Sequence, residues 1–143
     1  MLAVDTNVLV YAHRADSEFH EPAARSIREL AESRAPWAIP WPCLHEFYAI
    51  VTHPRIYRPA STSTQALNQI DAWVASPSLV LLTETSRHHE ELSEAIRVSN
   101  CVGPAVHDAR IAALCAENGV RELLTLDRDF ARYPKLTTVS LLK

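Results

Sequence analysis

Four acidic residues stand among apolar neighbours, where an ionised side chain is unexpected. They are Asp5 in LAVDTNVLV, Glu46 in CLHEFYAIV, Asp108 in AVHDARIAAL and Asp127 in LLTLDRDF. An isolated ionised carboxylate in apolar surroundings is costly unless it is paired or bound to a metal ion. These four residues are therefore the first candidates for chemistry in this chain.

Carboxylates that a fold brings together repel one another. Two unit charges ~4 Å apart repel by about 4 kcal/mol at an effective dielectric constant of 20, which is large against the ~5–15 kcal/mol net stability of a domain. Divalent cations turn this repulsion into binding, and a set of oxygen ligands favours Mg²⁺ or Mn²⁺ over zinc. Because such ions polarise a phosphoryl oxygen and lower the pKa of bound water, a cluster of these acids predicts hydrolysis of phosphodiesters.

Each acid also has an ordinary structural explanation. Asp108 lies in the first turn of a predicted helix, where a negative charge complements the helix N-terminus. Asp127 with Asp129 fits a turn, and Glu46 fits a partly exposed helix position. Asp5 is harder to explain in this way, because it ends an apolar strand and is followed by two polar residues. Taken together, the four acids favour a shared site.

The spacing of apolar residues divides the chain into alternating strands and helices. Short apolar runs indicate strands, and recurrence every three or four residues indicates helices. This alternation predicts an α/β fold with a parallel sheet covered on both faces. We interpret residues 1–143 as a single domain, because no repeat or long linker interrupts them. The predicted strands are Leu2–Val4, Trp37–Ile39, Leu79–Leu82, Leu123–Leu126 and Thr138–Leu142, and the predicted helices are Val8–Arg14, Glu18–Arg34, a helix beginning at Pro42, Ser63–Ala75, His88–Ser99 and Val106–Glu117.

Two of the four acids follow predicted strands directly. Asp5 comes after the first strand and Asp127 after the fourth. In a parallel sheet the ligand crevice lies beyond the carboxyl ends of the strands. The sequence therefore predicts that these two carboxylates lie at the edge where a ligand binds.

Composition excludes some classes of protein. With only two glycines, the chain lacks the glycine-rich loops of Walker-type and dinucleotide-binding proteins. The net charge of −3 does not decide whether the partner is a nucleic acid, since 12 of the 14 basic residues are arginine, the side chain best suited to phosphate. No apolar run approaches the ~20 residues of a membrane span, and the N-terminus lacks the basic start of a signal peptide. Three widely spaced cysteines indicate free thiols in a reducing compartment, so we expect a cytoplasmic protein without a membrane partner.

Other ligand-rich or aromatic residues have simpler interpretations. His88-His89-Glu90-Glu91 fits a solvated helix face, because consecutive helical residues point about 100° apart and rarely bind one ion. No HExxH or paired Cys/His spacing occurs. We expect the aromatic residues to fill the core or a subunit interface rather than to stack on bases; they are Trp37, Trp41, Phe47, Tyr48 and Trp73.

The sequence resembles the PIN-domain ribonucleases and, within them, the VapC-type toxins of VapBC toxin–antitoxin pairs. The matching segments are VDTNVLVYAHRADSEFHEPA, LHEFYAIVTHPRIYRPAS, HDARIAALCAENGV and LLTLDRDFARYPKL. They cover nearly the whole chain. DTN, EF, DAxIAA and TxDxDF are specific when they occur together in this order.

The resemblance implies a three-layer α/β/α sandwich with four or five parallel strands and an endoribonuclease that uses Mg²⁺ or Mn²⁺. It also implies an RNA substrate, inhibition by a cognate VapB antitoxin, and a homodimer. The acidic residues of the family fall on the four acids named above, which would be both metal ligands and catalytic residues. Asn7 and Thr125 match polar residues that orient water or an acid, and Asp129 matches an auxiliary acid. His45 and His107 are outside the family pattern, so packing or support of the ligands is expected of them.

Two other functions are compatible with parts of the sequence. A strand-end Asp also opens haloacid-dehalogenase-type phosphatases, but these Mg²⁺-dependent enzymes need a second Asp where this chain has Asn7. A PIN fold that only binds RNA or a protein is the non-catalytic alternative, and a nuclease assay with and without EDTA separates it from the enzyme. Transfer, ribosomal and messenger RNA all remain possible substrates.

Overall fold

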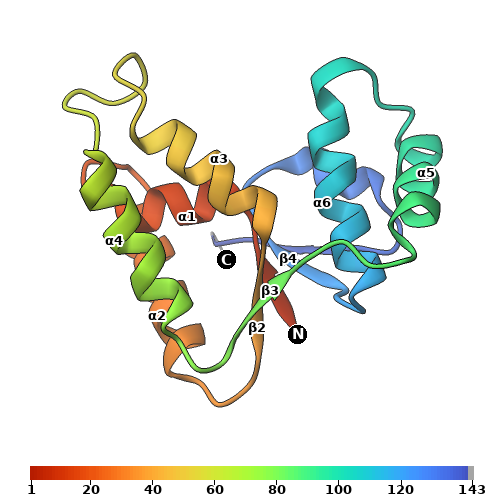
Figure 1. Cartoon of the computed structure of the whole chain (residues 1–143), viewed down its shortest axis with the longest axis horizontal. Coiled ribbons are helices and arrows are strands. Elements are labelled where there is room, and N and C mark those ends of the chain that lie inside the picture. Colours follow the sequence, from red (N-terminus) through yellow and green to blue (C-terminus); the bar gives the residue numbers. More distant parts are fainter. Residues whose placement is uncertain (142–143) are drawn as a thin grey trace.

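The computed structural model describes residues 1–141 and contains a sheet of five parallel strands. The strand order is β3-β2-β1-β4-β5: β1 is central, β2 and β3 follow on one side of it, and β4 and β5 follow on the other. Figure 1 shows α1 to α4 on one side of this sheet and α5 and α6 on the other. This arrangement confirms the predicted three-layer α/β/α sandwich. The strands are β1 (Leu2–Val4), β2 (Trp37–Pro40), β3 (Leu79–Leu82), β4 (Glu122–Leu124) and β5 (Thr137–Val139).

Six α-helices connect and cover the strands, close to where the apolar spacing predicted them. Two short 3₁₀ helices, η1 and η2, precede α6 and follow β4. The helices are α1 (Thr6–His13), α2 (His20–Glu32), α3 (Trp41–Val51), α4 (Ser63–Val74), α5 (His88–Ser99) and α6 (Val106–Glu117), with η1 at Gly103–Ala105 and η2 at Arg128–Arg132. None of the helices within the described residues is long and apolar enough to cross a membrane.

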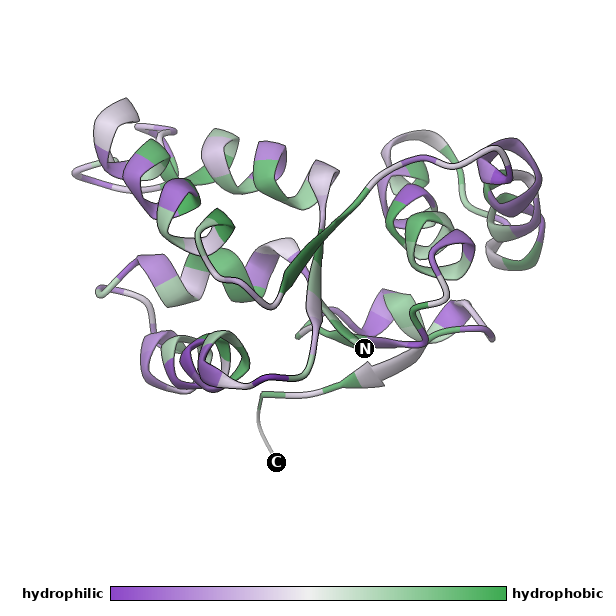
Figure 2. Ribbon diagram, turned by 60° about the horizontal axis from the view of Figure 1, so that its bottom comes forward, coloured by the Kyte–Doolittle hydropathy of each residue, from purple (hydrophilic) through white to green (hydrophobic). Residues whose placement is uncertain are grey.

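The core lies between the sheet and its two helical layers. Figure 2 shows hydrophobic residues concentrated on the central strands and on the sides of the helices that face them. The strand residues Val4, Ile39 and Leu123 are fully enclosed. As predicted, Trp37, Phe47 and Trp73 belong to this core.

Two of the aromatic residues expected in the core or a subunit interface lie at the surface of the chain, so the core is excluded for them and the interface stays a prediction. Trp41 and Tyr48 are each 38% exposed. Both lie on the side of α3 that points away from the sheet, because the opposite side carries the buried Leu44 and Phe47. The sequence pattern did not decide between core and interface for them, because most positions of α3 are apolar or aromatic and this hides the period of its buried face.

Two strand ends differ from prediction. Strand β4 stops at Leu124 rather than Leu126, because the Thr125 hydroxyl accepts a hydrogen bond from the Asp127 N–H (2.9 Å) and turns the backbone. Asp127 therefore caps η2 instead of ending a strand. Strand β5 covers Thr137–Val139, and the predicted last residue, Leu142, lies outside the described residues.

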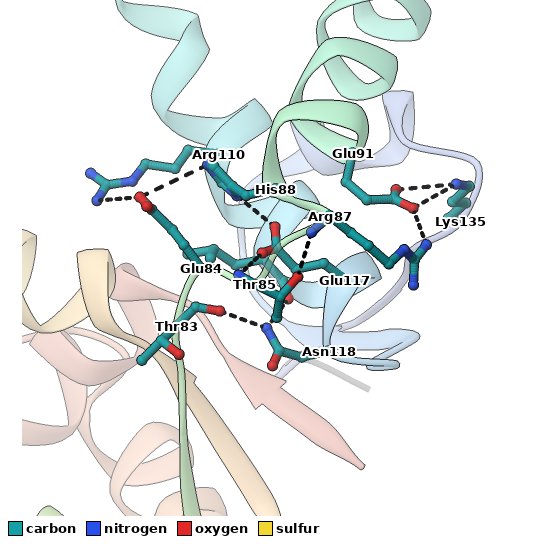
Figure 3. Close-up of polar contacts among 11 residues, drawn as sticks. Thr83, Glu84, Thr85, Arg87, His88, Glu91, Arg110, Glu117, Asn118 and Lys135 are labelled. Atoms are coloured by element: carbon teal, nitrogen blue, oxygen red, sulfur yellow. Dashed lines mark hydrogen bonds and ion pairs between the residues drawn. The ribbon is translucent and has the colours of Figure 1, made fainter.

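The interpretation of His88-His89-Glu90-Glu91 as a solvated face was wrong for two of its members. The Nδ1 of His88 bonds with Oε2 of the buried Glu117 at 2.5 Å, and Glu91 is only 5% exposed (Figure 3). Arg87 and Lys135 both form ion pairs with Glu91. The two carboxylates, Glu91 and Glu117, are buried because α5 packs against α6. Their burial is tolerated because each has a partner.

A first prediction concerns the packing of α3, the helix that carries Glu46. The Phe47 ring is fully buried and lies edge-on to the Trp73 ring, 4.8 Å between centroids. Phe47→Ala should lower the free energy of unfolding by about 3–5 kcal/mol, because it leaves a cavity. The matched control Tyr48→Ala, at the exposed neighbouring position, should cost less than about 1 kcal/mol. Equal losses in urea denaturation would show that α3 does not pack as described.

Candidate metal and catalytic site

Asp5 lies at the centre of the site, directly after β1, and is only 5% exposed. Its Oδ1 accepts a hydrogen bond from the Thr6 N–H (2.8 Å), which caps α1, and its Oδ2 accepts one from the Thr125 hydroxyl (2.7 Å). The Asp5 N–H donates to the carbonyl of Leu124 at the end of β4. Asp5 is thus fixed where the chain order reverses between β1 and β4, the position at which open parallel sheets bind ligands.

Three further acids meet beside this position. Asp108 lies in the first turn of α6, Asp127 caps η2, and Asp129 is the second residue of η2. One carboxylate oxygen from each lies within 4.8 Å of the others. The Asp127 Oδ1 also accepts a hydrogen bond from the Asp129 N–H (2.9 Å), which holds the pair in place.

Glu46 reaches the site from the middle of α3. Its Oε2 accepts a hydrogen bond from the Thr6 hydroxyl at 3.1 Å. The Thr6 N–H also donates a hydrogen bond to Asp5, so this one residue links the two acids. Three helices and the segment after β4 therefore converge at one edge of the sheet.

Two acids of the site have raised pKa values. Burial raises the pKa of Asp5 to about 6, the hydrogen bonds from Thr125 and Thr6 oppose the rise, and the charges of Glu46 and Asp108 add to it. Burial likewise raises the pKa of Asp108 to about 6, helped by the charges of Asp127, Asp129 and Glu46. Burial is thus the main reason that the anions of Asp5 and Asp108 are disfavoured, and the neighbouring carboxylates add to it.

All five acids are among the residues that the sequence singled out. The structure brings oxygens of Asp108, Asp127 and Asp129 within 4.8 Å of one another, whereas Asp5 and Glu46 lie outside this group and are linked to each other through Thr6. Asp108 lies in the first turn of α6, where its charge can complement the helix N-terminus as the alternative explanation predicted. Its carboxylate also lies close to those of Asp127 and Asp129. Asp129, expected to be auxiliary, has a carboxylate oxygen within 4.8 Å of an oxygen of each of the other two acids.

The auxiliary residues Asn7 and Thr125 contact the segment after β4. Thr125 accepts a hydrogen bond from the Asp127 N–H and donates one to Asp5, so it links two of the acids. The Asn7 side-chain oxygen accepts a long bond (3.5 Å) from the Leu126 N–H. Both residues hold the acids in position rather than adding a charge.

Thr6 and Cys43 are neighbours of the acids that sequence reasoning did not assign to the site. Thr6 contacts Asp5 and Glu46 as described above. Cys43 is fully buried on α3, and its thiol lies 3.9 Å from the Asp5 Oδ1. Burial raises the pKa of this thiol well above its usual range, so it stays neutral beside the acids. The position of Thr6 directly after a strand-end Asp was the available signal; Cys43 had none.

His45 and His107 are both exposed, although each directly precedes a site acid. His45 stacks on Trp41, with the ring centroids 6.1 Å apart. The charge of His107 favours the ionised form of Asp108 and so lowers its pKa. Within residues 1–141, neither histidine belongs to the group of acids whose oxygens converge.

The residues of the site fit a divalent cation. The donors are carboxylate oxygens, which suit hard cations that prefer oxygen ligands. The neighbouring carboxylates contribute to the raised pKa of Asp5 and of Asp108, and a cation among them would oppose that contribution. The nearby guanidinium group of Arg132 contacts Asp129 at 3.9 Å, which leaves most of the negative charge uncompensated.

Comparisons with known proteins agree with this geometry. The family model described as PIN domain matches residues 2–136. Ribonuclease VapC43 of Mycobacterium tuberculosis is 34% identical over 136 residues, covering 95% of this chain and 92% of that protein.

Two solved structures share the fold. A chain of VapBC2 from Rickettsia felis, solved bound to a DNA fragment from the promoter, gives a TM-score of 0.66 at 19% identity, and the match covers 97% of both chains. Mycobacterium tuberculosis VapC20, described as a toxin that cleaves the sarcin-ricin loop, gives a TM-score of 0.68 at 16% identity and covers 92% of this chain and 93% of its own. The chain therefore belongs to the PIN domain family, in its VapC branch.

Proposed function

We propose that this chain is a metal-dependent endoribonuclease and the toxin of a toxin–antitoxin pair. The observation that carries the proposal is the convergence of Asp5, Glu46, Asp108, Asp127 and Asp129 at one edge of the sheet. A relative that matches almost the full length of the chain is named a ribonuclease. A solved structure with the same fold is a VapBC complex. The proposed partners are accordingly an RNA substrate and a cognate antitoxin.

The acids would hold Mg²⁺ or Mn²⁺, with Asp108, Asp127 and Asp129 as the tightest group and Asp5 and Glu46 beside them. A bound ion of this kind supplies a water of lowered pKa and a counter-charge for a phosphoryl oxygen. In the metal-free protein the pKa values of Asp5 and Asp108 are about 6, so a cation that both carboxylates would hold would displace their protons near that pH. Thr6 and Thr125 keep the carboxylates oriented, and Arg132, which contacts Asp129, could steady negative charge.

The rest of the proposal concerns organisation and location. We take residues 1–143 to be one domain, which the family match over residues 2–136 supports. A homodimer is supported by apolar side chains exposed on α4, where Leu67 is 54% and Val74 is 45% accessible. The three free cysteines, two of them buried, support a cytoplasmic location.

The direct test of the function is loss of cleavage when a ligand is neutralised. Asp5→Asn and Asp108→Asn should each lower the rate of RNA cleavage in Mg²⁺ by more than about a hundredfold, because even supporting residues around a metal cost ~10–100-fold. The exposed Asp71→Asn on α4 is the matched control and should keep wild-type activity. Cleavage retained in both site variants, or cleavage by the wild type in excess EDTA, would rule the mechanism out and leave a non-catalytic binding module.

A second test addresses the Thr125 hydroxyl. Thr125→Val keeps the shape of the side chain but removes both the donor to Asp5 and the acceptor for the Asp127 N–H. The Mg²⁺ concentration that gives half-maximal cleavage should rise by about 10–100-fold. Thr125→Ser, which keeps the hydroxyl, should restore most of the affinity. If the valine and serine variants behave alike, the hydroxyl does not position the acids.

A third test uses the raised pKa of Asp5. Because its pKa is near 6 in the folded chain and about 4 when unfolded, the metal-free protein holds that proton more tightly when folded. The stabilisation that comes from this tighter proton binding by Asp5 is complete below pH ~4 and is lost as the pH rises through about 6.

In EDTA at pH 7.5, Asp5→Asn should therefore be more stable than the wild type by about 2–3 kcal/mol, and the difference should shrink toward pH 4. Saturating Mg²⁺ should reverse the order, because only the wild type gains the full cation affinity. Chemical denaturation at several pH values measures this. A difference that does not change with pH would contradict the assignment.

A further inference from the structure

The α3–α4 loop, residues 52–62, lies in the longest stretch of the chain without an acidic residue, between Glu46 and Asp71. It carries Arg55 and Arg58, which are both exposed. Within residues 1–141, neither of these guanidinium groups forms an ion pair with a carboxylate. The loop therefore presents two uncompensated positive charges on a chain whose net charge is −3.

Backbone hydrogen bonds give this loop a defined shape. The Ser61 N–H donates to the Val51 carbonyl (2.8 Å) and so joins the two ends of the loop. Between them, the N–H groups of Ile56 and Tyr57 donate to the carbonyl of His53 (3.0 and 3.1 Å). Compact surface loops whose ends meet in this way are frequently functional.

Arg14, the residue that follows α1, attaches the loop to that helix. Its guanidinium group donates to the Pro59 carbonyl (3.0 Å) and to the Ser61 hydroxyl (3.2 Å), and it lies over the Tyr57 ring, 4.3 Å from the centroid. Asp16 accepts two further bonds from the same group (2.9 and 2.7 Å). The charge of Arg14 is thus compensated, and this residue holds the loop rather than a ligand.

One face of α3 leads from the acids to the loop. Ala49 and Ile50 follow Glu46 by three and four residues, so they lie on the same face of the helix. Ala49 is exposed, Ile50 is half-buried, and neither carries a charge. The helix ends at Val51, about 7.5 Å along its axis from Glu46. Figure 1 shows the loop, in yellow, projecting beyond this end of α3.

Helix α1 gives a second measure of the separation between the acids and the loop. Asp5 caps the start of α1, and Arg14, which holds the loop, follows its end. The 8 residues of this helix rise by about 12 Å. A stacked nucleic-acid strand carries one phosphate about every 3.4 Å, so the loop lies about three to four phosphates from the acids.

We propose that the α3–α4 loop binds the phosphate backbone of the RNA about three to four nucleotides from the scissile phosphodiester, through Arg55 and Arg58. The inference rests on the proposed ribonuclease function and adds a second contact region for the same substrate. Such a region is needed because the acids repel every phosphate that is not next to a bound cation. A nucleic acid is favoured over an acidic peptide because the two arginines lie along the face of α3 that starts at the acids.

The test measures steady-state cleavage in Mg²⁺ of an RNA whose cleaved bond has been mapped, shortened from either side by single nucleotides. For the wild type in about 0.1 M salt, KM should rise roughly 25-fold when one flank becomes shorter than about three nucleotides, because two phosphate contacts worth about fivefold each are lost. The value of kcat should change little. Arg55→Gln combined with Arg58→Gln should show the raised KM at every length, without this step. A purely structural role of the arginines would raise KM and leave the step in place.

Two control variants separate the loop from net charge and from side-chain shape. Arg25→Gln combined with Arg28→Gln removes the same charge from exposed positions of α2, a helix that also carries acidic residues. This variant should keep the wild-type KM at every length. Arg55→Lys combined with Arg58→Lys keeps the charge and should keep the step. All variants should unfold at the urea concentration of the wild type.

Binding without cleavage distinguishes failure of this proposal from failure of the proposed function. In the Asp108→Asn background, Arg55→Gln combined with Arg58→Gln should lower the salt dependence of binding to an oligouridylate of about 12 nucleotides by a slope of about 1.4, twice that of one single-strand phosphate contact. Fluorescence anisotropy measures this slope. If the wild type cleaves no RNA but the slope falls, the ribonuclease proposal fails and the loop stands as an RNA-binding site.

Three results overturn the loop site. One is a wild-type KM that does not depend on the length of either flank. Another is a step in KM that remains in Arg55→Gln combined with Arg58→Gln, which would assign the flank to other residues. The third is an equal loss of affinity in the α2 control, which would reflect net charge alone. In each case, cleavage by the wild type leaves the ribonuclease proposal in place.

Discussion

The structure depends on how five carboxylates are kept close together despite their mutual repulsion. Two threonine hydroxyls and two backbone N–H groups hold individual oxygens of Asp5, Glu46 and Asp127 in fixed positions. These bonds orient the acids but do not neutralise them. Burial, together with the charges of neighbouring acids, raises the pKa of Asp5 and of Asp108, and a cation would offset both effects.

The sheet provides the rigidity that this arrangement requires. Asp5 follows the central strand, and the backbone bond from its N–H to Leu124 joins it to the next strand. The helices that carry Glu46 and Asp108 pack through fully buried residues such as Phe47 and Ile111. Positions on packed helices and strand ends move little, which suits ligands that must be placed within a fraction of an ångström.

Much of this was predictable from the sequence because the site acids interrupt apolar patterns. Asp5, Glu46 and Asp108 stand out for this reason, and the alternation of strands and helices predicted the edge at which two of the acids meet. The exact end of β4 was not predictable, since it depends on the Thr125 hydroxyl bonding across the turn. The burial of Glu117 and Glu91 was missed for a similar reason: it depends on which helix packs against which, and spacing along one helix does not contain that information.

The central claim is that these acids tolerate one another by sharing a divalent cation. Calorimetric titration with Mn²⁺ in buffers of different ionisation enthalpy tests it most directly. At pH 6 binding should release protons, because Asp5 and Asp108 must lose theirs to become ligands, and at pH 8 the release should disappear. Absence of Mn²⁺ binding, or binding with no proton release at pH 6, would contradict the account.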